Sequence, residues 1–268
     1  MRLDPPPPLH VRLLGGFRVE RVGAAPPVCW QRRAAKALVK LLATCPRHAL
    51  HREQVLEILW RDADAESARN SFGKALHAAR RALEPELLPR EGSAYVRLSD
   101  SMVALDTRHV SIDADRFELL AQRALRRDDP PVYEAALVEY GGELLPEDRY
   151  EDWCTERRGF LAEIHVRLLL ALADALERRG ACTAAEDRLR EAVRHDPTRE
   201  DVHRRLMIMY ASAGTRDRAV RQFHYCRDAM RRELGLAPQG ETVALYQDIL
   251  ADRIPVPTSP RSSLLATA

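Results

Sequence analysis

Four side chains with hydrogen-bond donors recur along one stretch of the sequence, residues 64–83. They are Asn70, Lys74, His77 and Arg81, and no acidic residue interrupts their spacing of three or four positions. An α-helix turns by 100° per residue, so this spacing predicts that all four share one helix face. Such side chains donate to base edges and phosphate oxygens, which makes DNA contact the chemistry to test. A basic helix face is also common on solvated helices, so the neighbouring elements must separate the two interpretations.

The same stretch has the pattern of an amphipathic helix. Asp64 is placed to cap its N-terminus, Glu66 lies in its first turn, and Arg80 and Arg81 lie in its last turns. This order of charges suits the helix dipole, with acids near the N-terminus and bases near the C-terminus. An apolar stripe opposite the basic face predicts packing against a core and consists of Ala68, Phe72, Ala75, Leu76, Ala79 and Leu83.

The flanking segments predict the order of a winged helix. Residues 9–22 alternate apolar and polar side chains and predict strands, and residues 31–43 and 52–60 predict two helices before the basic one. After it, residues 95–98 and 102–105 alternate around a short polar turn and predict a β-hairpin. In a winged helix the third helix enters the major groove of DNA and the hairpin wing lies against the backbone.

Helical patterns alone continue the chain from residue 111. A repeat of 34 residues relates Leu172, Leu176, Ala185 and Leu189 to Leu206, Tyr210, Ala219 and Phe223, which is the tetratricopeptide period. Stacked helix pairs of this kind usually bind protein. We therefore predict a mainly α chain with an α+β winged-helix domain at 1–109, an all-α tetratricopeptide-like domain at 110–254, and a disordered tail or linker at 255–268.

Charge is distributed unevenly between the two predicted domains. Residues 1–109 hold 18 Lys and Arg against 12 Asp and Glu, a net charge of +6, and residues 110–268 hold 24 against 28, a net charge of −4. This asymmetry is expected of a nucleic-acid module joined to a protein-binding module. Five scattered cysteines and the lack of a long apolar run predict reduced thiols, no membrane span and a cytoplasmic, nucleoid-associated protein.

Nothing in the sequence predicts catalysis, a cofactor or a metal. Cys45, His48 and His51 have ligand chemistry, but they lie near a proline without a fourth ligand, so we interpret them as turn residues. Trp153 and its neighbours are interpreted as core rather than as a ligand pocket. The Gly-Gly pairs in LLGGF and EYGGE match no phosphate-binding fingerprint, and no nucleophile elbow or HExxH motif occurs.

Several motifs together resemble a known family. They are RLLGGFRV, HREQVLEILW leading into ESARNSFGKALHAARRAL, EYGGELLPEDRYEDWCTERR, HDPTREDVHRRLMIMYASAG and LGLAPQGETVALYQDIL. From residue 9 to residue 250, the chain is similar to bacterial transcriptional activators of the antibiotic-regulatory-protein class. In that class an OmpR-type winged helix precedes a bacterial transcriptional activation domain.

The resemblance implies roles for individual residues. It implies DNA contact by Asn70, Lys74, His77 and Arg81, and contact of the wing with DNA through Arg97. It also implies that a loop between the second and third helices faces RNA polymerase, formed by Arg61, Asp62, Ala63, Asp64 and Ala65. The chain departs from the family where Arg61 follows Trp60, since a proline often stands there, and at Gly73, which costs a helix about 1 kcal/mol relative to Ala.

Two functions remain open at this point. The first is a sequence-specific activator that binds promoter direct repeats as a homodimer and contacts RNA polymerase. The second is a protein-interaction scaffold whose winged helix no longer reads DNA, as Gly73 could indicate. A decayed reading face should have gained acidic or apolar residues, and this face retains four polar or basic ones, which favours the activator.

Overall fold

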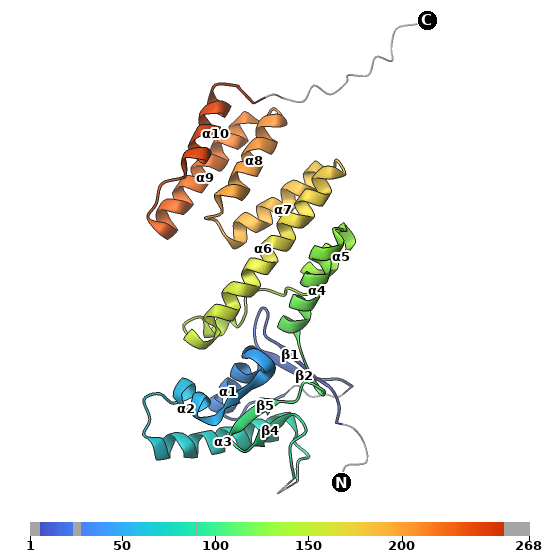
Figure 1. Ribbon diagram of the computed structural model, residues 1–268, viewed down its shortest axis with the longest axis vertical. Coiled ribbons are helices and arrows are strands. Elements are labelled where there is room, and N and C mark those ends of the chain that lie inside the picture. The colour runs from blue at the N-terminus through green and yellow to red at the C-terminus, as the bar shows by residue number, and fades with distance from the viewer. Residues whose placement is uncertain (1–5, 24–27, 89–90, 255–268) are drawn as a thin grey trace, which may run out of the picture. The chain divides into compact units, whose positions relative to one another are not determined.

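A computed structural model describes residues 6–23, 28–88 and 91–254 of the chain (Figure 1). The chain divides into two compact units, and each is treated by itself. Unit 1 comprises residues 1–123 and 135–165, and unit 2 comprises residues 124–134 and 166–268. The helices α4 (Asp113–Arg127), α5 (Pro130–Val138) and α6 (Thr155–Arg178) each contribute residues to both units.

Two small sheets frame unit 1. In the first, β1 (Leu9–Arg12) pairs antiparallel with β2 (Arg18–Arg21) and parallel with β6 (Val110–Ile112). In the second, β5 (Met102–Leu105) lies between β3 (Ala49–His51) and β4 (Val96–Ser99), antiparallel to both. In the first sheet the alternating apolar residues are buried, as the period-two pattern requires. In the second sheet Val96, Val103 and Leu105 are buried, whereas Leu98 and Met102 are exposed.

Three helices complete the winged helix, and they follow the predicted order. They are α1 (Arg33–Thr44), α2 (Arg52–Leu59) and α3 (Ala65–Leu83). The helix α1 buries Leu38, Val39 and Leu42 fully, and α2 contributes Val55 to the same core. The predicted hairpin is also confirmed, because β4 and β5 pair in register from Val96 opposite Leu105 to Ser99 opposite Met102. The strands β3 and β6 were not predicted.

A loop after α5 pairs with the turn between β1 and β2. The amide of Gly15 donates to the carbonyl oxygen of Glu143 at 2.9 Å, and the amide of Leu145 donates to that of Leu13 at 2.9 Å. Gly15 has a φ of +78°, and a Cβ atom there would lie 2.5 Å from the carbonyl oxygen of Gly141. The two Gly-Gly motifs of the sequence thus serve one close backbone approach, for which only glycine fits.

Ion pairs hold two 3₁₀ turns of unit 1 against its helices. Lys40 of α1 is buried and pairs with Asp148 and, at 2.9 Å, with Glu147; both acids belong to the 3₁₀ turn η2 (Pro146–Asp148). His48 lies in a second such turn, η1 (Pro46–His48), and its Nε2 is 2.8 Å from a carboxylate oxygen of Asp115 on α4. Burial opposes the charged form of His48, but the hydrogen bond and charge of Asp115 outweigh it and raise its pKa.

Unit 2 contains stacked helices. After the last part of α6 come α7 (Cys182–His195), α8 (Glu200–Ser212), α9 (Arg216–Leu234) and α10 (Gly240–Leu250). Neighbouring helices lie side by side in Figure 1. The residues of the predicted 34-residue repeat are buried in this stack, apart from half-buried Leu176. The mainly α fold class, with a winged helix and tetratricopeptide-like helices, is therefore confirmed.

The ends of several elements differ from the predicted ones. The helix expected at 31–43 begins at Arg33. In the predicted all-α domain, α6 begins at Thr155, directly after the 3₁₀ turn η3 (Asp152–Cys154). The predicted boundary after residue 109 falls directly before β6, whose partner is β1. The predicted tail at 255–268 lies outside the described residues. Within the described part of the chain, no helix is long and apolar enough to cross a membrane.

Candidate nucleic-acid interface

The helix α3 is fixed at its start by its cap and along its length by its apolar side. A side-chain oxygen of Asp64 accepts from the amides of Glu66 at 3.1 Å and Ser67 at 2.9 Å. These hydrogen bonds satisfy two of the free N–H groups at the helix start and lower the pKa of Asp64. The predicted apolar stripe is buried, and the ring of Phe72 packs edge-on against that of Trp60, with 6.4 Å between the ring centroids. One face of α3 is therefore committed to the core.

The opposite face of α3 is open to solvent. Asn70, Lys74, His77 and Arg81 are all exposed, as the helical spacing predicted. Within the described part of the chain, no side-chain hydrogen bond or ion pair engages Asn70, Lys74 or His77. We call the surface formed by these four side chains the α3 outer face. The donors of Asn70, Lys74 and His77 make no hydrogen bond among the described residues.

The two arginines at the end of α3 have different surroundings. Arg81 donates through one guanidinium nitrogen to the carbonyl oxygen of Leu87 at 2.9 Å and keeps its other donors available. Arg80 is half-buried, and its Nε donates to the carbonyl oxygen of Val96 in β4 at 3.0 Å. This bond joins the helix to the hairpin, so Arg80 has a positioning role that its place in the sequence did not reveal.

The wing holds its predicted contact residue next to an acid. The guanidinium of Arg97 is 55% exposed, and its Nε lies 3.5 Å from a carboxylate oxygen of buried Asp106. Arg108 pairs with the same carboxylate at 2.6 Å. The hydrogen bond from Arg108 is the main cause that lowers the pKa of Asp106 to about 2. Two arginines therefore share one permanent negative charge, and part of the charge of Arg97 is already balanced.

The loop between α2 and α3 is a separate exposed feature. All five residues from Arg61 to Ala65 are exposed, and the amide of Ala63 closes a turn by donating to the carbonyl oxygen of Trp60 at 3.0 Å. Asp64 is occupied as the helix cap. The side chains of Arg61 and Asp62 are therefore the charged groups of this loop that a partner can reach.

Two further residues of the α3 outer face were not assigned a role from the sequence. Arg69 is exposed beside Asn70 and adds a cation at the edge of the face. Gly73 is also exposed, and its backbone is helical. Exposure at helical spacing was the available signal for Arg69, although it lies outside the four-residue pattern that we followed.

The three residues with zinc-ligand chemistry near Pro46 each serve the local structure. Cys45 donates through Sγ to the carbonyl oxygen of Leu42 at 3.4 Å, and burial raises its thiol pKa to about 11. His48 pairs with Asp115. His51 caps α2, with Nδ1 accepting from the amide of Glu53 at 3.3 Å. Each of the three side chains therefore has a role in the local structure, although His51 ends β3 and caps α2 and does not lie in a turn as predicted.

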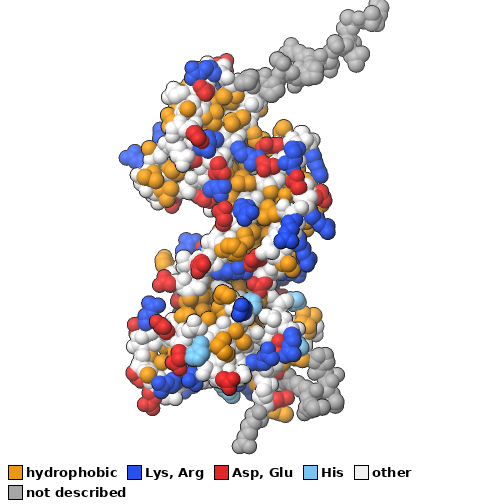
Figure 2. Space-filling model, viewed as in Figure 1, with side chains coloured by type: hydrophobic (Ala, Val, Ile, Leu, Met, Phe, Trp, Pro, Cys, Tyr) orange, Lys and Arg blue, Asp and Glu red, His pale blue; other side chains and the backbone are white. Residues whose placement is uncertain are grey.

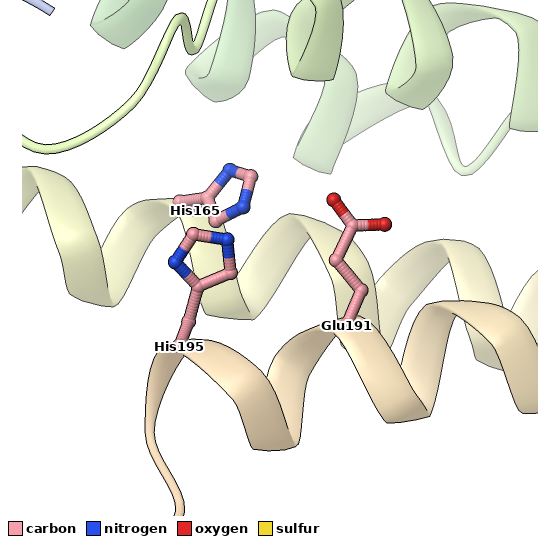
Figure 3. Close-up of side chains that lie close together, drawn as sticks. All are labelled: His165, Glu191 and His195. Carbon is pink, nitrogen blue, oxygen red and sulfur yellow. The ribbon is translucent and has the colours of Figure 1, made fainter. Parts of the chain in front are cut away.

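Histidine and glutamate side chains also occur together on the later helices. Glu191 and His195 are four residues apart on α7 and point to the same side of that helix, and His165 lies on α6 (Figure 3). The α7 pair offers two ligand atoms, which is fewer than the three or four protein ligands of a zinc site. His165 belongs to unit 1 and the pair to unit 2, so the three side chains do not define a site within either unit.

Comparison with known proteins places the chain in a family. Residues 112–250 match the model of the family described as the bacterial transcriptional activator domain. The chain belongs to this family. It is a bacterial transcription regulator of the antibiotic-regulatory-protein class, and the family consists of regulators rather than enzymes. Among curated proteins, none matches the chain.

Solved structures support the fold of this family member. The chain is similar to Mycobacterium tuberculosis EmbR, which was solved in complex with a low affinity phosphopeptide, with a TM-score of 0.73 and 20% identity. The match covers 93% of this chain and 66% of that chain, so the protein spans about two thirds of its length. The TPR2B domain of yeast Sti1, solved with pHsp70, has 16% identity over 53% of this chain and 98% of its own. Its TM-score of 0.34 establishes no shared fold.

Proposed function

We propose that this protein is a sequence-specific DNA-binding transcription activator that acts on the nucleoid in the cytoplasm. The observation that carries the proposal is the α3 outer face, where Asn70, Lys74 and His77 are exposed and unengaged within the described residues. Side chains that make no hydrogen bond or ion pair within the described residues are available for an external ligand. Membership of a regulator family makes duplex DNA the ligand that fits this face best.

The chemistry of the α3 outer face suits the major groove. An asparagine amide can donate to and accept from adenine in a bidentate pair, and Lys or Arg donates to the N7 and O6 acceptors of guanine. Asn70 and Lys74 lie near the middle of the exposed stretch of α3, and Arg81 lies near its end. We therefore assign base reading to Asn70 and Lys74, with His77 and Arg81 contacting bases or the adjacent phosphates.

The wing is assigned to the DNA backbone. Arg97 is the cation of β4 that is exposed, and Arg80 ties this strand to α3 through the carbonyl oxygen of Val96. This tie fixes the distance between the wing and the reading helix, so that both can bind one duplex without rearrangement. Phosphate contacts of this kind set register and affinity, and they carry no direct sequence information.

The protein is proposed to occupy DNA as a homodimer on direct repeats. One reading helix covers few base pairs, and such a site cannot be singled out among about 10⁶ or more competing genomic positions. A second protomer on an adjacent repeat multiplies the specificity. The helices of residues 110–254 are the proposed surface for the second protomer, since their part of the chain carries a net negative charge and is not drawn to phosphate.

RNA polymerase is the proposed partner of the loop from Arg61 to Ala65. The loop is exposed and lies next to α3, so a protein bound to promoter DNA through α3 would hold it close to the adjacent polymerase. Arg61→Ala with Asp62→Ala should leave DNA affinity unchanged and abolish activation in a transcription reaction with purified polymerase. Equal loss of DNA binding and activation would refute a separate polymerase contact.

DNA selection with the full chain tests the proposal directly. The protein is mixed with random-sequence duplexes, bound duplexes are recovered over several rounds, and the enriched sequence is footprinted. We expect two direct repeats on one face of the helix, and separation of the repeats by half a helical turn should abolish paired binding. A protein that enriches no sequence at low salt is the interaction scaffold instead, because its winged helix does not read DNA.

A further inference from the structure

Gly73 occupies the α3 outer face without serving the fold. Its backbone is helical, and it is not among the glycines of positive φ. Apart from the neighbouring backbone of its own helix, no atom of the described residues lies within 4 Å of the place where a Cβ atom would stand. Glycine is a poor helix former, because it loses the most conformational freedom on folding. The fold would therefore be more stable with alanine at this position.

The neighbours of Gly73 give the position a chemical setting. Arg69 and His77 lie one turn before and one turn after it, Asn70 lies three residues before it, and Lys74 follows it. All four side chains are exposed. Residues three or four apart are neighbours on a helix surface, so these side chains border a place where the backbone itself is uncovered. A duplex held by the bordering donors would come within contact distance of the helix backbone at this place.

We propose that Gly73 is a positioning residue for DNA binding, which lets α3 lie closer to the base edges than any larger residue would allow. The inference rests on the proposed function. It explains why a glycine stands at a position where alanine would make the fold more stable. A Cβ atom at position 73 would hold the helix away from the groove and lengthen the hydrogen bonds of Asn70 and His77. Hydrogen bonds weaken steeply once donor and acceptor separate beyond about 3.2 Å.

A matched pair of substitutions tests the proposal. Gly159 is also an exposed glycine in a helix, α6, and a Cβ atom there would likewise meet no atom within 4 Å. Gly73→Ala and Gly159→Ala should both raise the melting temperature, by about 2–4 °C for a change of this kind in a chain of this size. The shared gain in stability shows that both variants fold. Only Gly73→Ala should lose DNA affinity.

The probes are a duplex with one repeat of the sequence enriched by the wild-type chain, on which contacts between protomers do not contribute, and a duplex of the same length with scrambled sequence. For the enriched duplex, Gly73→Ala should weaken binding by about fivefold or more, in the range of a lost base contact. Gly73→Leu keeps good helix propensity and adds bulk, so it should weaken binding further. The scrambled duplex, held through phosphates, should show a smaller loss for both variants.

The outcomes separate this inference from the proposed function. If the wild-type chain enriches a duplex and both Gly73 variants bind it as tightly as wild type, the close approach is refuted and the proposed function stands. If the two variants lose the same affinity for enriched and scrambled duplexes, Gly73 does not position base contacts. If the wild-type chain enriches no duplex, both the proposed function and this inference fail.

Discussion

Basic residues on α3 and basic residues on the helices of unit 2 differ in what surrounds them. On α3, Lys74 is exposed and meets no acid within the described residues. In unit 2, Arg178 pairs with Asp128 at 2.7 Å and Arg205 pairs with Asp174 at 2.6 Å. Figure 2 shows the same intermixing of Lys and Arg with Asp and Glu over much of the visible surface.

The difference shows that the number of cations on a helix does not decide whether it can bind DNA. An arginine that already pairs with a carboxylate must give up that partner, or bring it towards the phosphates, before it can neutralise DNA. The sequence of α9 holds six arginines against three in α3, but Arg218 pairs with Glu186 and Arg221 pairs with Asp217. On α9, Arg231 is exposed without such a partner among the described residues, but on α3 two cations without one, Arg69 and Lys74, lie beside Asn70 and His77 on one exposed face.

Charge reversal at Lys74 should have the largest effect on DNA binding. Lys74→Glu removes one donor and places an acid on the α3 outer face, so the loss should be about tenfold or more on every duplex. Arg227→Glu on α9 is the control, since Arg227 is 48% exposed and already pairs with Asp228. Fluorescence anisotropy with labelled single-repeat duplexes measures both without contacts between protomers, and equal losses for the two variants would contradict the difference between the helices.

Removal of the Asn70 amide should affect one class of duplex. Asn70→Ala takes away a bidentate base contact, so affinity for the enriched duplex should fall by about 1–3 kcal/mol while affinity for scrambled DNA stays the same. Lys74→Ala should relax base preference by a similar amount. Competition binding with single-base variants of the enriched duplex locates the position read by each side chain. A uniform loss over all variants would show that Asn70 does not read a base.

Truncation of the wing arginine should give a smaller and uniform loss. Arg97 shares Asp106 with Arg108, so only part of its charge acts on DNA. Arg97→Ala should weaken enriched and scrambled duplexes alike and reduce the slope of log K against log salt by about 1 or less. Arg108→Ala is the comparison, because it removes the other arginine that pairs with Asp106 and leaves the Arg97 side chain unchanged. Sequence-dependent loss in Arg97→Ala would assign base reading to the wing.

The paired cations of unit 2 should contribute nothing to DNA binding. Arg178 and Asp128 are both more than half exposed, and exposed pairs contribute about 1 kcal/mol or less to stability. Arg178→Ala should therefore leave the affinity for a duplex with a single repeat, on which contacts between protomers do not contribute, at the wild-type value and lower the free energy of unfolding only slightly. Urea unfolding and anisotropy measure the two quantities. A clear loss of DNA affinity would place part of the interface in unit 2.

Elements with a long periodic pattern could be predicted from the sequence, and elements defined by distant partners could not. The cap of Asp64 and the buried stripe of α3 follow from local spacing, and the structure confirms both. The strand β6 has three residues and pairs with β1, about 100 residues earlier, so no local pattern distinguishes it. The buried Lys40 lies within the helix predicted at residues 31–43, but Glu147 and Asp148, which make its burial possible, come from a remote turn.

The same reason limits the prediction of the interface. Exposure of Asn70, Lys74, His77 and Arg81 follows from helical geometry, and their roles in DNA contact remain predictions. The Arg80 bond to Val96 depends on how the hairpin folds back on α3, which spacing along one helix does not encode. Partial neutralisation of Arg97 by Asp106 has the same origin, since the two residues lie on opposite sides of the hairpin turn.

The dependence of DNA affinity on salt for the full chain tests the central claim most directly. Lys74, Arg81 and Arg97 are the proposed permanent cations of each protomer at the DNA, so a pair of protomers should give a slope of about −5 in log K against log salt. Lys74→Glu should make this slope shallower, and Arg178→Ala should leave it unchanged. Binding that is absent at low salt, or that does not vary with salt, would contradict the claim that the unengaged cations of α3 and the wing bind DNA.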